Sequence, residues 1–197
     1  MGERSSAYEG ASAHIRKLRA AVARKDTPLR RELIDLIESG RHLVIGAAAL
    51  ARYVRPRFTD DVDYAVGLAL FRRVRKWFKD HADITPYVDE GEALRCQALG
   101  VDVINAAANE VLRFVLKAER GLPSPEGLAA CKYAAMTSPT RGRAERLQDA
   151  ADLAKLVALS DFDTGRLLSF LVGPYEPDRP RVRRLISDLR AGRPIRI

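Results

Sequence analysis

The sequence predicts an α/β fold of the α+β kind, with a small mixed sheet as its core and a helical C-terminal part. Two observations lead to this prediction. Apolar runs of strand length alternate with helical patterns in the first half of the chain, whereas from Asn109 onward the apolar spacing is almost entirely helical. A Pro-rich turn, which begins at Gly121, lies near the change. We therefore expect a core with N-terminal helices over residues 1–120 and a helical part, packed on that core, over residues 121–197.

The elements of the first half follow from apolar spacing and from glycines. Residues 13–24 and 29–39 place apolar side chains at helical intervals, and Gly40 is suited to end the second helix. The apolar run at 42–45 is too short for a helix and is predicted to be a buried strand that ends at Gly46. The remaining predictions are a helix at 47–53, a strand at 61–66, a basic helix at 71–80, and strands at 93–99 and 101–106.

The second half is predicted to consist of helices. Their apolar residues recur at intervals of three and four positions, which is typical of helices with one buried face. The predicted ranges are 110–120, 125–136, 143–159, 164–171 and 180–191.

Composition limits the classes of partner. The chain of 197 residues has a formal net charge of +8 and a pI near 9.8. A basic balance favours polyanionic partners such as nucleotides or RNA, although a generally basic, solvated surface would give the same charge. The chain has no apolar run near the ~20 residues of a membrane span and no secretory signal, so we expect no membrane partner and a cytoplasmic location. Cys96 and Cys131 have no metal-ligand spacing and are expected to be reduced and packed.

Two carboxylates lie two residues apart in the predicted strand at 61–66. Side chains alternate along a strand, so Asp61 and Asp63 project to the same face, about 6–7 Å apart, and repel each other. A divalent cation would compensate this repulsion. Mg²⁺ in particular prefers one or two carboxylates together with water and substrate phosphates. The alternative is that both acids line a solvated strand face, and the neighbouring Asp60 is expected to be a turn or edge residue.

A third carboxylate, Asp102, lies within the apolar run VDVI at residues 101–104. A charge buried in such a strand is very costly without a partner, so Asp102 is expected to share the site. The alternatives are that Asp102 is a lone acid at a sheet edge or forms a salt bridge. The strand at 42–45 ends at Gly46, where a helix begins. Free backbone N–H groups at a helix N-terminus could bind a phosphate group there.

The order of these motifs resembles the nucleotidyltransferase superfamily, and within it the minimal AbiEii-type toxins of toxin–antitoxin systems. The shared pattern is a strand that ends in Gly, a short helix, then Arg-x-Thr-x-Asp-h-Asp (h hydrophobic) and a third Asp on a later strand. The matching positions are Gly46, Arg57, Thr59, Asp61, Asp63 and Asp102. Further on, the segment from Lys132 to Asp152 is similar to a helical Lys-x-x-Ala…Asp-x-x-Asp-Leu stretch of that family.

The resemblance implies a nucleotidyltransferase-like fold and an enzyme that moves a nucleotidyl group from an NTP to a hydroxyl of RNA, such as tRNA, or of a protein. It also implies Mg²⁺ or Mn²⁺ as the cofactor and a cognate antitoxin as a partner. The implied catalytic residues are Asp61, Asp63, Asp102 and Lys132, of which the three acids are the metal ligands. The implied nucleotide-binding positions are Gly46, Ala47, Arg57, Thr59 and Asp149.

The chain departs from the family at the phosphate loop, which usually reads Gly-Gly or Gly-Ser but here reads Gly46-Ala47-Ala48. The change removes a hydroxyl contact to the triphosphate, and an alanine Cβ limits close approach of the backbone. A non-catalytic member of the same fold that binds a nucleotide or RNA is therefore the alternative. A third hypothesis is an RNA-binding module that uses the Arg-rich residues 179–196.

The helical stretch also has structural interpretations. Lys132 lies in an apolar helix and could extend its ammonium group to the surface. Asp149 and Asp152 lie three residues apart on one helix face. They could form salt bridges with Arg143, Arg146 or Lys155 instead of facing a nucleotide.

Overall fold

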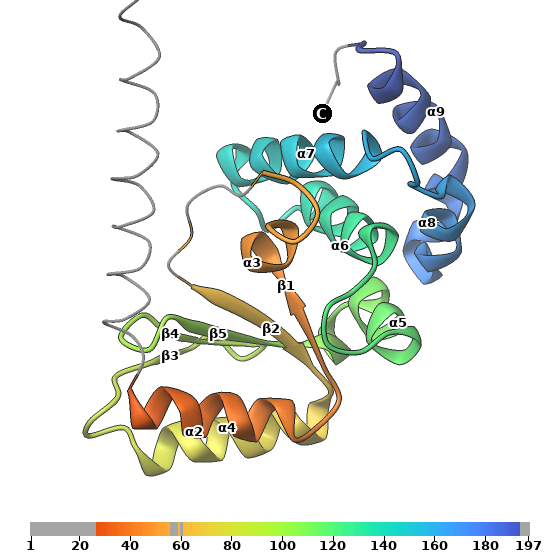
Figure 1. The fold of residues 1–197 in the computed structure, drawn as a ribbon. Helices are drawn as coiled ribbons and strands as arrows, with labels where there is room; N and C mark the ends of the chain where they lie inside the picture. Colours follow the sequence, from red (N-terminus) through yellow and green to blue (C-terminus); the bar gives the residue numbers. More distant parts are fainter. Residues whose placement is uncertain (1–26, 56–58, 60, 194–197) are drawn as a thin grey trace, which may run out of the picture.

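The structure is a computed structural model that describes residues 27–55, 59 and 61–193 of the chain (Figure 1). Within these residues a mixed sheet of five strands is combined with helices, so the predicted mixed α/β fold class is confirmed. The helix predicted at residues 13–24 lies outside the described residues. The described part contains no helix that is both long and apolar enough to span a bilayer.

The sheet has the strand order β1-β2-β5-β4-β3. Only its central pair, β2 and β5, is parallel, and the other three pairs are antiparallel. Valine and isoleucine are frequent in the inner strands, as is usual for a pleated surface buried on both faces. The strands are β1 (His42–Ile45), β2 (Val62–Val66), β3 (Val88–Asp89), β4 (Ala93–Cys96) and β5 (Val101–Asn105).

One face of the sheet is covered by α2 (Pro28–Glu38) and α4 (Leu68–Asp80), which run side by side below the strands in Figure 1. Thr27 caps α2, since its hydroxyl accepts a hydrogen bond from the N–H of Arg30, and Pro28 occupies the first turn, where it needs no N–H partner. Both helices bury one apolar stripe against Tyr64, Val66 and other residues of the sheet. This layer forms one of two hydrophobic cores.

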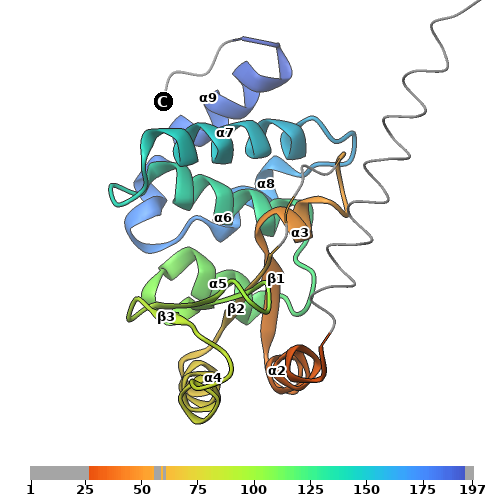
Figure 2. The same cartoon turned by 90° about the vertical axis from the view of Figure 1, so that its left-hand side faces the viewer.

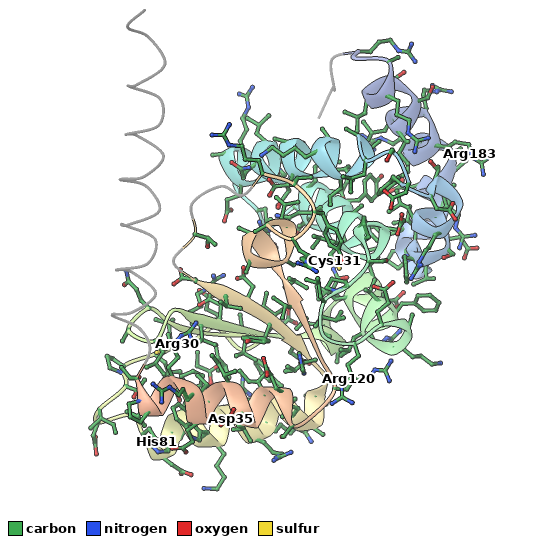
Figure 3. All side chains as sticks on the ribbon, viewed as in Figure 1. Arg30, Asp35, His81, Arg120, Cys131 and Arg183 are labelled. Atoms are coloured by element: carbon green, nitrogen blue, oxygen red, sulfur yellow. The ribbon has the colours of Figure 1, made fainter. Side chains whose placement is uncertain are left out.

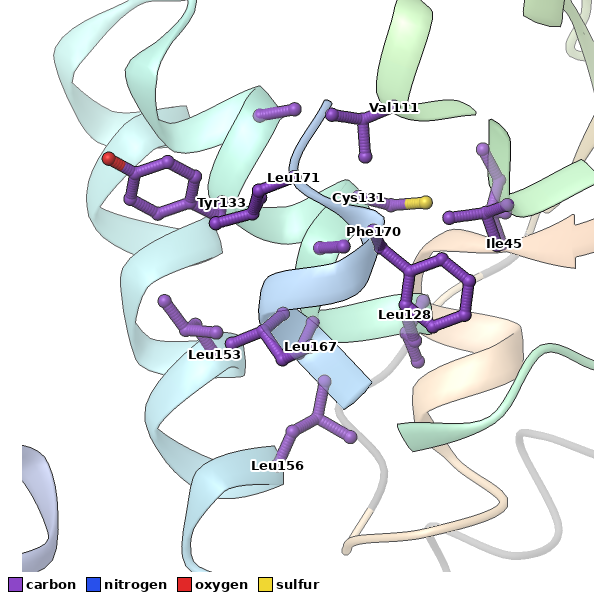
Figure 4. Packing of buried hydrophobic residues seen from close by; sticks show 14 of the residues in the cluster. Ile45, Val111, Leu128, Cys131, Tyr133, Leu153, Leu156, Leu167, Phe170 and Leu171 are labelled. Carbon is purple, nitrogen blue, oxygen red and sulfur yellow. The ribbon is translucent and has the colours of Figure 1, made fainter. Parts of the chain in front are cut away.

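The C-terminal helices lie on the opposite face, as the perpendicular view in Figure 2 shows. Helix α6 is buried along nearly its whole length because α5, α7 and α8 all pack against it. Figure 4 shows apolar side chains of α6, α7 and α8 interdigitating in this second core. The helices of the chain other than α2 and α4, within the described residues, are α3 (Gly46–Leu50), η1 (Ala106–Ala108), α5 (Glu110–Ala118), α6 (Pro125–Thr137), α7 (Arg143–Val157), α8 (Thr164–Phe170), η2 (Gly173–Asp178) and α9 (Arg179–Arg190).

The alternation of strand side chains decides which residues face which core. On β2, Tyr64 and Val66 belong to the core beneath α2 and α4, while Ala65 belongs to the core beneath the C-terminal helices. Asp63 lies two residues before Ala65, so its side chain points toward the C-terminal helices. The two acids of β2 and β5 are thereby placed between the sheet and the helical part.

Several predicted boundaries differ from the structure. The strand predicted at 93–99 ends at Cys96, because residues 97–100 form the tight turn into β5, where Gly100 has a positive φ of 61°. The helix predicted at 47–53 begins one residue earlier and ends at Leu50. Strand β3 was not predicted, since its two residues are too few for an alternating pattern. The predicted start of α4 was three residues late, because Gly67 precedes the helix as its N-cap.

Candidate functional site

Asp63 and Asp102 lie side by side on the central parallel strands. They are Cα partners in the register of β2 and β5, which places their side chains on the same face of the sheet, about 4.8 Å apart at the backbone. The same row continues on either side, with Ile45 opposite Asp63 and Arg95 opposite Asp102. The sheet therefore carries two adjacent carboxylates with a cation at the end of the row.

Asp61 immediately precedes β2. Its backbone N–H and carbonyl both interact with the hydroxyl of Thr59, at 3.4 and 3.1 Å, and this local turn fixes the entry to the strand. The charge of Asp61 also raises the pKa of Asp63 and of Asp102, so the three acids act on one another electrostatically. Arg57, which was predicted to lead into this pair, lies outside the described residues.

The pKa of Asp63 is raised from 3.8 to about 6. Burial is the largest cause, because a charged carboxylate loses hydration between the sheet and α6, and the neighbouring charge of Asp102 adds to it. Lys132 acts in the opposite direction and lowers the pKa. At neutral pH Asp63 is a carboxylate held in an unfavourable environment, which a cation would relieve.

Asp102 is paired with Arg95, whose guanidinium lies 2.9 Å from the Asp102 carboxylate. Burial raises the pKa of Asp102, and Arg95 lowers it in partial compensation. Arg95 also binds Glu90 and is itself half exposed. The salt bridge that was one of the alternatives for Asp102 is therefore present, and Asp102 lies on the same sheet face as Asp63.

Gly46 lies directly against Asp63. Its φ of +68° is in the left-handed region, and a Cβ placed on it would overlap Oδ2 of Asp63 and lie 2.8 Å from Cγ. Both observations require glycine at this position. The first residue of α3 thus packs against the carboxylate of Asp63. Ala47, the next residue of the loop, is buried within α3 and contributes its methyl group to packing.

Lys132 is part of a buried group of charges between α6 and α7. Its ammonium nitrogen lies 2.8 Å from Oδ1 of Asp149 and 2.8 Å from Oδ2 of Asp152. Arg141 binds the other oxygen of Asp149, also at 2.8 Å. Lys132, Asp149 and Asp152 are each no more than 6% exposed, so the ammonium group is not extended to the surface. Of the cations expected to pair with these acids, Lys155 lies 4.0 Å from Asp152.

A cavity of about 480 Å³ joins the two groups of charges. Gly46 and Asp63 line it on the sheet side, and Lys132, Arg141 and Asp149 line it on the side of α6 and α7. Its remaining wall is mostly apolar and includes Cys131, labelled in Figure 3 between α6 and the sheet, whose pKa burial raises to about 12. Cys131 and Cys96 are both buried free thiols, as predicted.

The structure thus brings four of the predicted site residues, Gly46, Asp63, Lys132 and Asp149, to the wall of one cavity. Asp102 is the strand neighbour of Asp63 and Asp61 precedes it by two residues, but neither of these two acids lines the cavity. Two residues of this region were not predicted. Arg95 lies between the buried Leu94 and Cys96, so the alternation of β4 indicates that its side chain faces the opposite side of the sheet from theirs. Its pairing with Asp102 could not be predicted, because that depends on the register of β4 and β5. Arg141 lies in a turn, where no periodicity indicates direction.

The donor set fits a hard divalent cation. Asp63 and Asp102 offer only carboxylate oxygens, and Mg²⁺ takes one or two such ligands and completes its shell with water and phosphate. Among the residues that the structure describes, no group of three or more His, Cys, Asp or Glu side chains is already gathered at metal-ligand positions. Asp63 and Asp102, with Asp61 beside them, are therefore the residues that would hold the ion.

Comparisons with protein-family models and with curated proteins find no match to this chain.

Proposed function

We propose that this protein is a metal-dependent nucleotidyltransferase, which moves a nucleotidyl group from an NTP to a hydroxyl of RNA, such as tRNA, or of a protein. The observation that carries the proposal is the in-register pair of Asp63 and Asp102. Of this pair Asp63 lines a cavity, and Lys132 and Arg141 line the same cavity from α6 and the turn before α7. Two repelling carboxylates next to a cavity are costly to the fold and are explained by a cation that neutralises them. A toxin that is neutralised by an antitoxin is the biological setting that the motif order suggests.

The reaction forms a bond between the acceptor oxygen and the α-phosphorus, breaks the bond from that phosphorus to its bridging oxygen, and releases pyrophosphate. A bound Mg²⁺ would supply charge neutralisation at the triphosphate. Asp61, Asp63 and Asp102 would hold the ion. Asp102, whose raised pKa makes it a better base, would also receive the proton of the acceptor hydroxyl. Gly46 packs closely against the carboxylate of Asp63 and limits its movement.

One observation favours a second candidate, a non-catalytic protein of the same fold that binds a nucleotide or RNA. The ammonium group of Lys132 is occupied by two carboxylates, whereas a catalytic lysine would be free to contact phosphate. In that case the cavity would bind its ligand without turnover.

The deciding experiment is incubation of the protein with each α-labelled NTP, Mg²⁺ or Mn²⁺, and total RNA. We expect label to be transferred to RNA or to protein by the wild type and not by Asp63→Asn. The matched control is Asp80→Asn, which removes an exposed acid of α4 that pairs with Lys76 on the far side of the sheet. NTP binding without transfer would favour the non-catalytic candidate, and equal transfer by both variants would contradict the proposed site.

A further inference from the structure

We infer that Arg141, rather than Lys132, is the cation that binds the phosphate chain of the ligand in the cavity, and that Asp149 positions it. The inference rests on the proposed function, since that function supplies the phosphate-bearing ligand. It assigns Lys132 a different task, which is to hold Asp149 in place.

Lys132 has little capacity left for a ligand. Its side chain is buried, and two carboxylates lie 2.8 Å from its nitrogen. To reach a phosphate the ammonium group would have to move away from Asp149 and Asp152, two buried carboxylates whose charge it helps to balance. Loss of charge compensation in a buried site is costly. Lys132 is therefore a structural counter-ion on the cavity wall.

Arg141 has the donors that Lys132 lacks. Its side chain is 41% exposed and lines the cavity, and the ion pair recorded for it uses one terminal nitrogen, Nη1, on Asp149. A guanidinium has five N–H donors in a planar fork, so several remain for a ligand. Such a fork matches the oxygens of a phosphate group in a bidentate manner.

Asp149 links the two cations. One of its oxygens accepts from Lys132 and the other from Arg141, so the carboxylate fixes the guanidinium from one side. Glu145 also lines the cavity, but its carboxylate accepts a hydrogen bond from the N–H of Gly142 at the start of α7. The chain Lys132–Asp149–Arg141 thus runs from the buried interior to the cavity and ends in a guanidinium. Within residues 27–55, 59 and 61–193, that guanidinium forms one ion pair, through Nη1.

The residues that line the cavity indicate the chemistry of the ligand beyond the phosphate oxygens that Arg141 would bind. Ile45, Ile104, Leu112 and Leu128 form an apolar surface between the sheet and α6. Asp63, at the sheet end, excludes an anion unless a cation accompanies it. The combination fits a polyphosphate that carries a divalent cation toward Asp63, contacts Arg141 with its phosphate oxygens, and places a flat apolar group against the aliphatic wall.

The test measures binding rather than transfer. Inorganic triphosphate and ATP are titrated into the wild type, Arg141→Gln, Arg141→Lys and Arg143→Gln by calorimetry at constant ionic strength, with EDTA and with Mg²⁺. Arg143 is the matched control, because it is an exposed arginine two residues away that does not line the cavity. We expect Arg141→Gln to weaken the binding of both probes about tenfold or more, since it removes hydrogen bonds to a charged group.

Arg141→Lys should recover only part of the affinity, because an ammonium group lacks the planar fork. Arg143→Gln should stay within about twofold of the wild type, as expected for a diffuse surface charge. Equal losses for Arg141→Gln and Arg143→Gln, or a wild type that binds neither probe, would overturn the inference. A wild type that binds both probes through Arg141 yet transfers no label would refute the proposed enzyme while leaving this inference intact.

Discussion

Asp63 of β2 and Asp102 of β5 are Cα partners in the parallel pair at the centre of the sheet, and their carboxylates share one face. Ala65 and Ile104, two residues further along the same face, belong to the core beneath the C-terminal helices, so the two acids lie next to that core. Arg95 neutralises Asp102 in part, but the pKa of Asp63 is still raised to about 6. The ionised Asp63 therefore lowers the free energy of unfolding at neutral pH, and this effect can be measured.

The stability of the metal-free protein should depend on pH through Asp63. The folded-state pKa of Asp63, about 6, lies above the ordinary value of 3.8. The protonated side chain therefore stabilises the folded state: this contribution to the free energy of unfolding is complete below about pH 3.8 and is lost as the pH rises through about 6. Asp63→Asn removes the ionisation. We expect the free energy of unfolding of the variant to rise relative to that of the wild type between about pH 4 and 6, by up to on the order of 3 kcal/mol. Denaturant unfolding in EDTA measures the gap.

The control for this prediction is Asp80→Asn. Asp80 is exposed and pairs with Lys76 within α4, so its replacement should leave the pH dependence unchanged. If the gap between Asp63→Asn and the wild type stays constant from pH 4.5 to 8, the carboxylate of Asp63 is not held in the environment described above.

Mg²⁺ binding should show the opposite dependence. The metal needs the ionised form of Asp63, so it competes with a proton below about pH 6. We expect the apparent affinity to fall by about tenfold per pH unit below that value and to be nearly constant above it, as one proton is displaced. Calorimetric titration of Mg²⁺ without nucleotide gives the profile, and Asp63→Asn should both weaken the binding and flatten the curve. An affinity that does not change between pH 5 and 8 would contradict a metal at Asp63.

Gly46→Ala tests the contact between the first residue of α3 and Asp63. Alanine would have to adopt a φ of +68° and would place its Cβ on the Asp63 carboxylate. Gly91→Ala is the matched control, since Gly91 has a φ of +83° with nothing within 4 Å of the added Cβ. We expect Gly91→Ala to cost about 1–2 kcal/mol from backbone strain alone, and Gly46→Ala to cost clearly more. Equal losses in thermal unfolding would show that the Gly46–Asp63 contact is not tight.

Helices and strands whose apolar residues recur at regular intervals could be predicted from the sequence. Alternation along residues 61–66 indicated that acids and apolar residues of β2 face opposite ways, and the structure agrees for Asp63 and Tyr64. The neighbouring position of Asp63 and Asp102 depends on strand order, and local periodicity contains no information on which strands pair. The motif order of the resemblance was what suggested that these acids belong together.

The partners of Lys132 could not be predicted from the sequence either. Its helix was predicted within one residue, yet the partners of its ammonium group come from α7, seventeen and twenty residues later. Helical spacing placed Asp149 and Asp152 on one face but did not reveal which cation that face meets. Only the packing of α6 against α7 resolves this, because several arginines and lysines nearby were equally suitable in sequence.

Lys132→Met and Lys155→Met separate a buried counter-ion from a surface charge. Removal of Lys132 takes away an ammonium group that lies 2.8 Å from each of two buried carboxylates. Asp149 keeps its ion pair with Arg141, and Asp152 keeps the hydrogen bond from Gln148 and the more distant Lys155 at 4.0 Å. We expect a loss of about 3–5 kcal/mol, which corresponds to a decrease in Tm on the order of 10 °C. Lys155 is 44% exposed, so its replacement should cost less than about 1 kcal/mol.

The cause of the loss can be checked in the same series. If uncompensated charge destabilises Lys132→Met, then adding Asp152→Asn should restore part of the Tm, although Asp152→Asn alone should lower it. Such coupling is expected only for groups in direct contact. A different outcome, in which Lys132→Met unfolds at the wild-type temperature but no longer binds ATP or inorganic triphosphate, would show that the ammonium group serves the ligand. It would then be the lysine, as the resemblance implies, and not Arg141 that contacts phosphate.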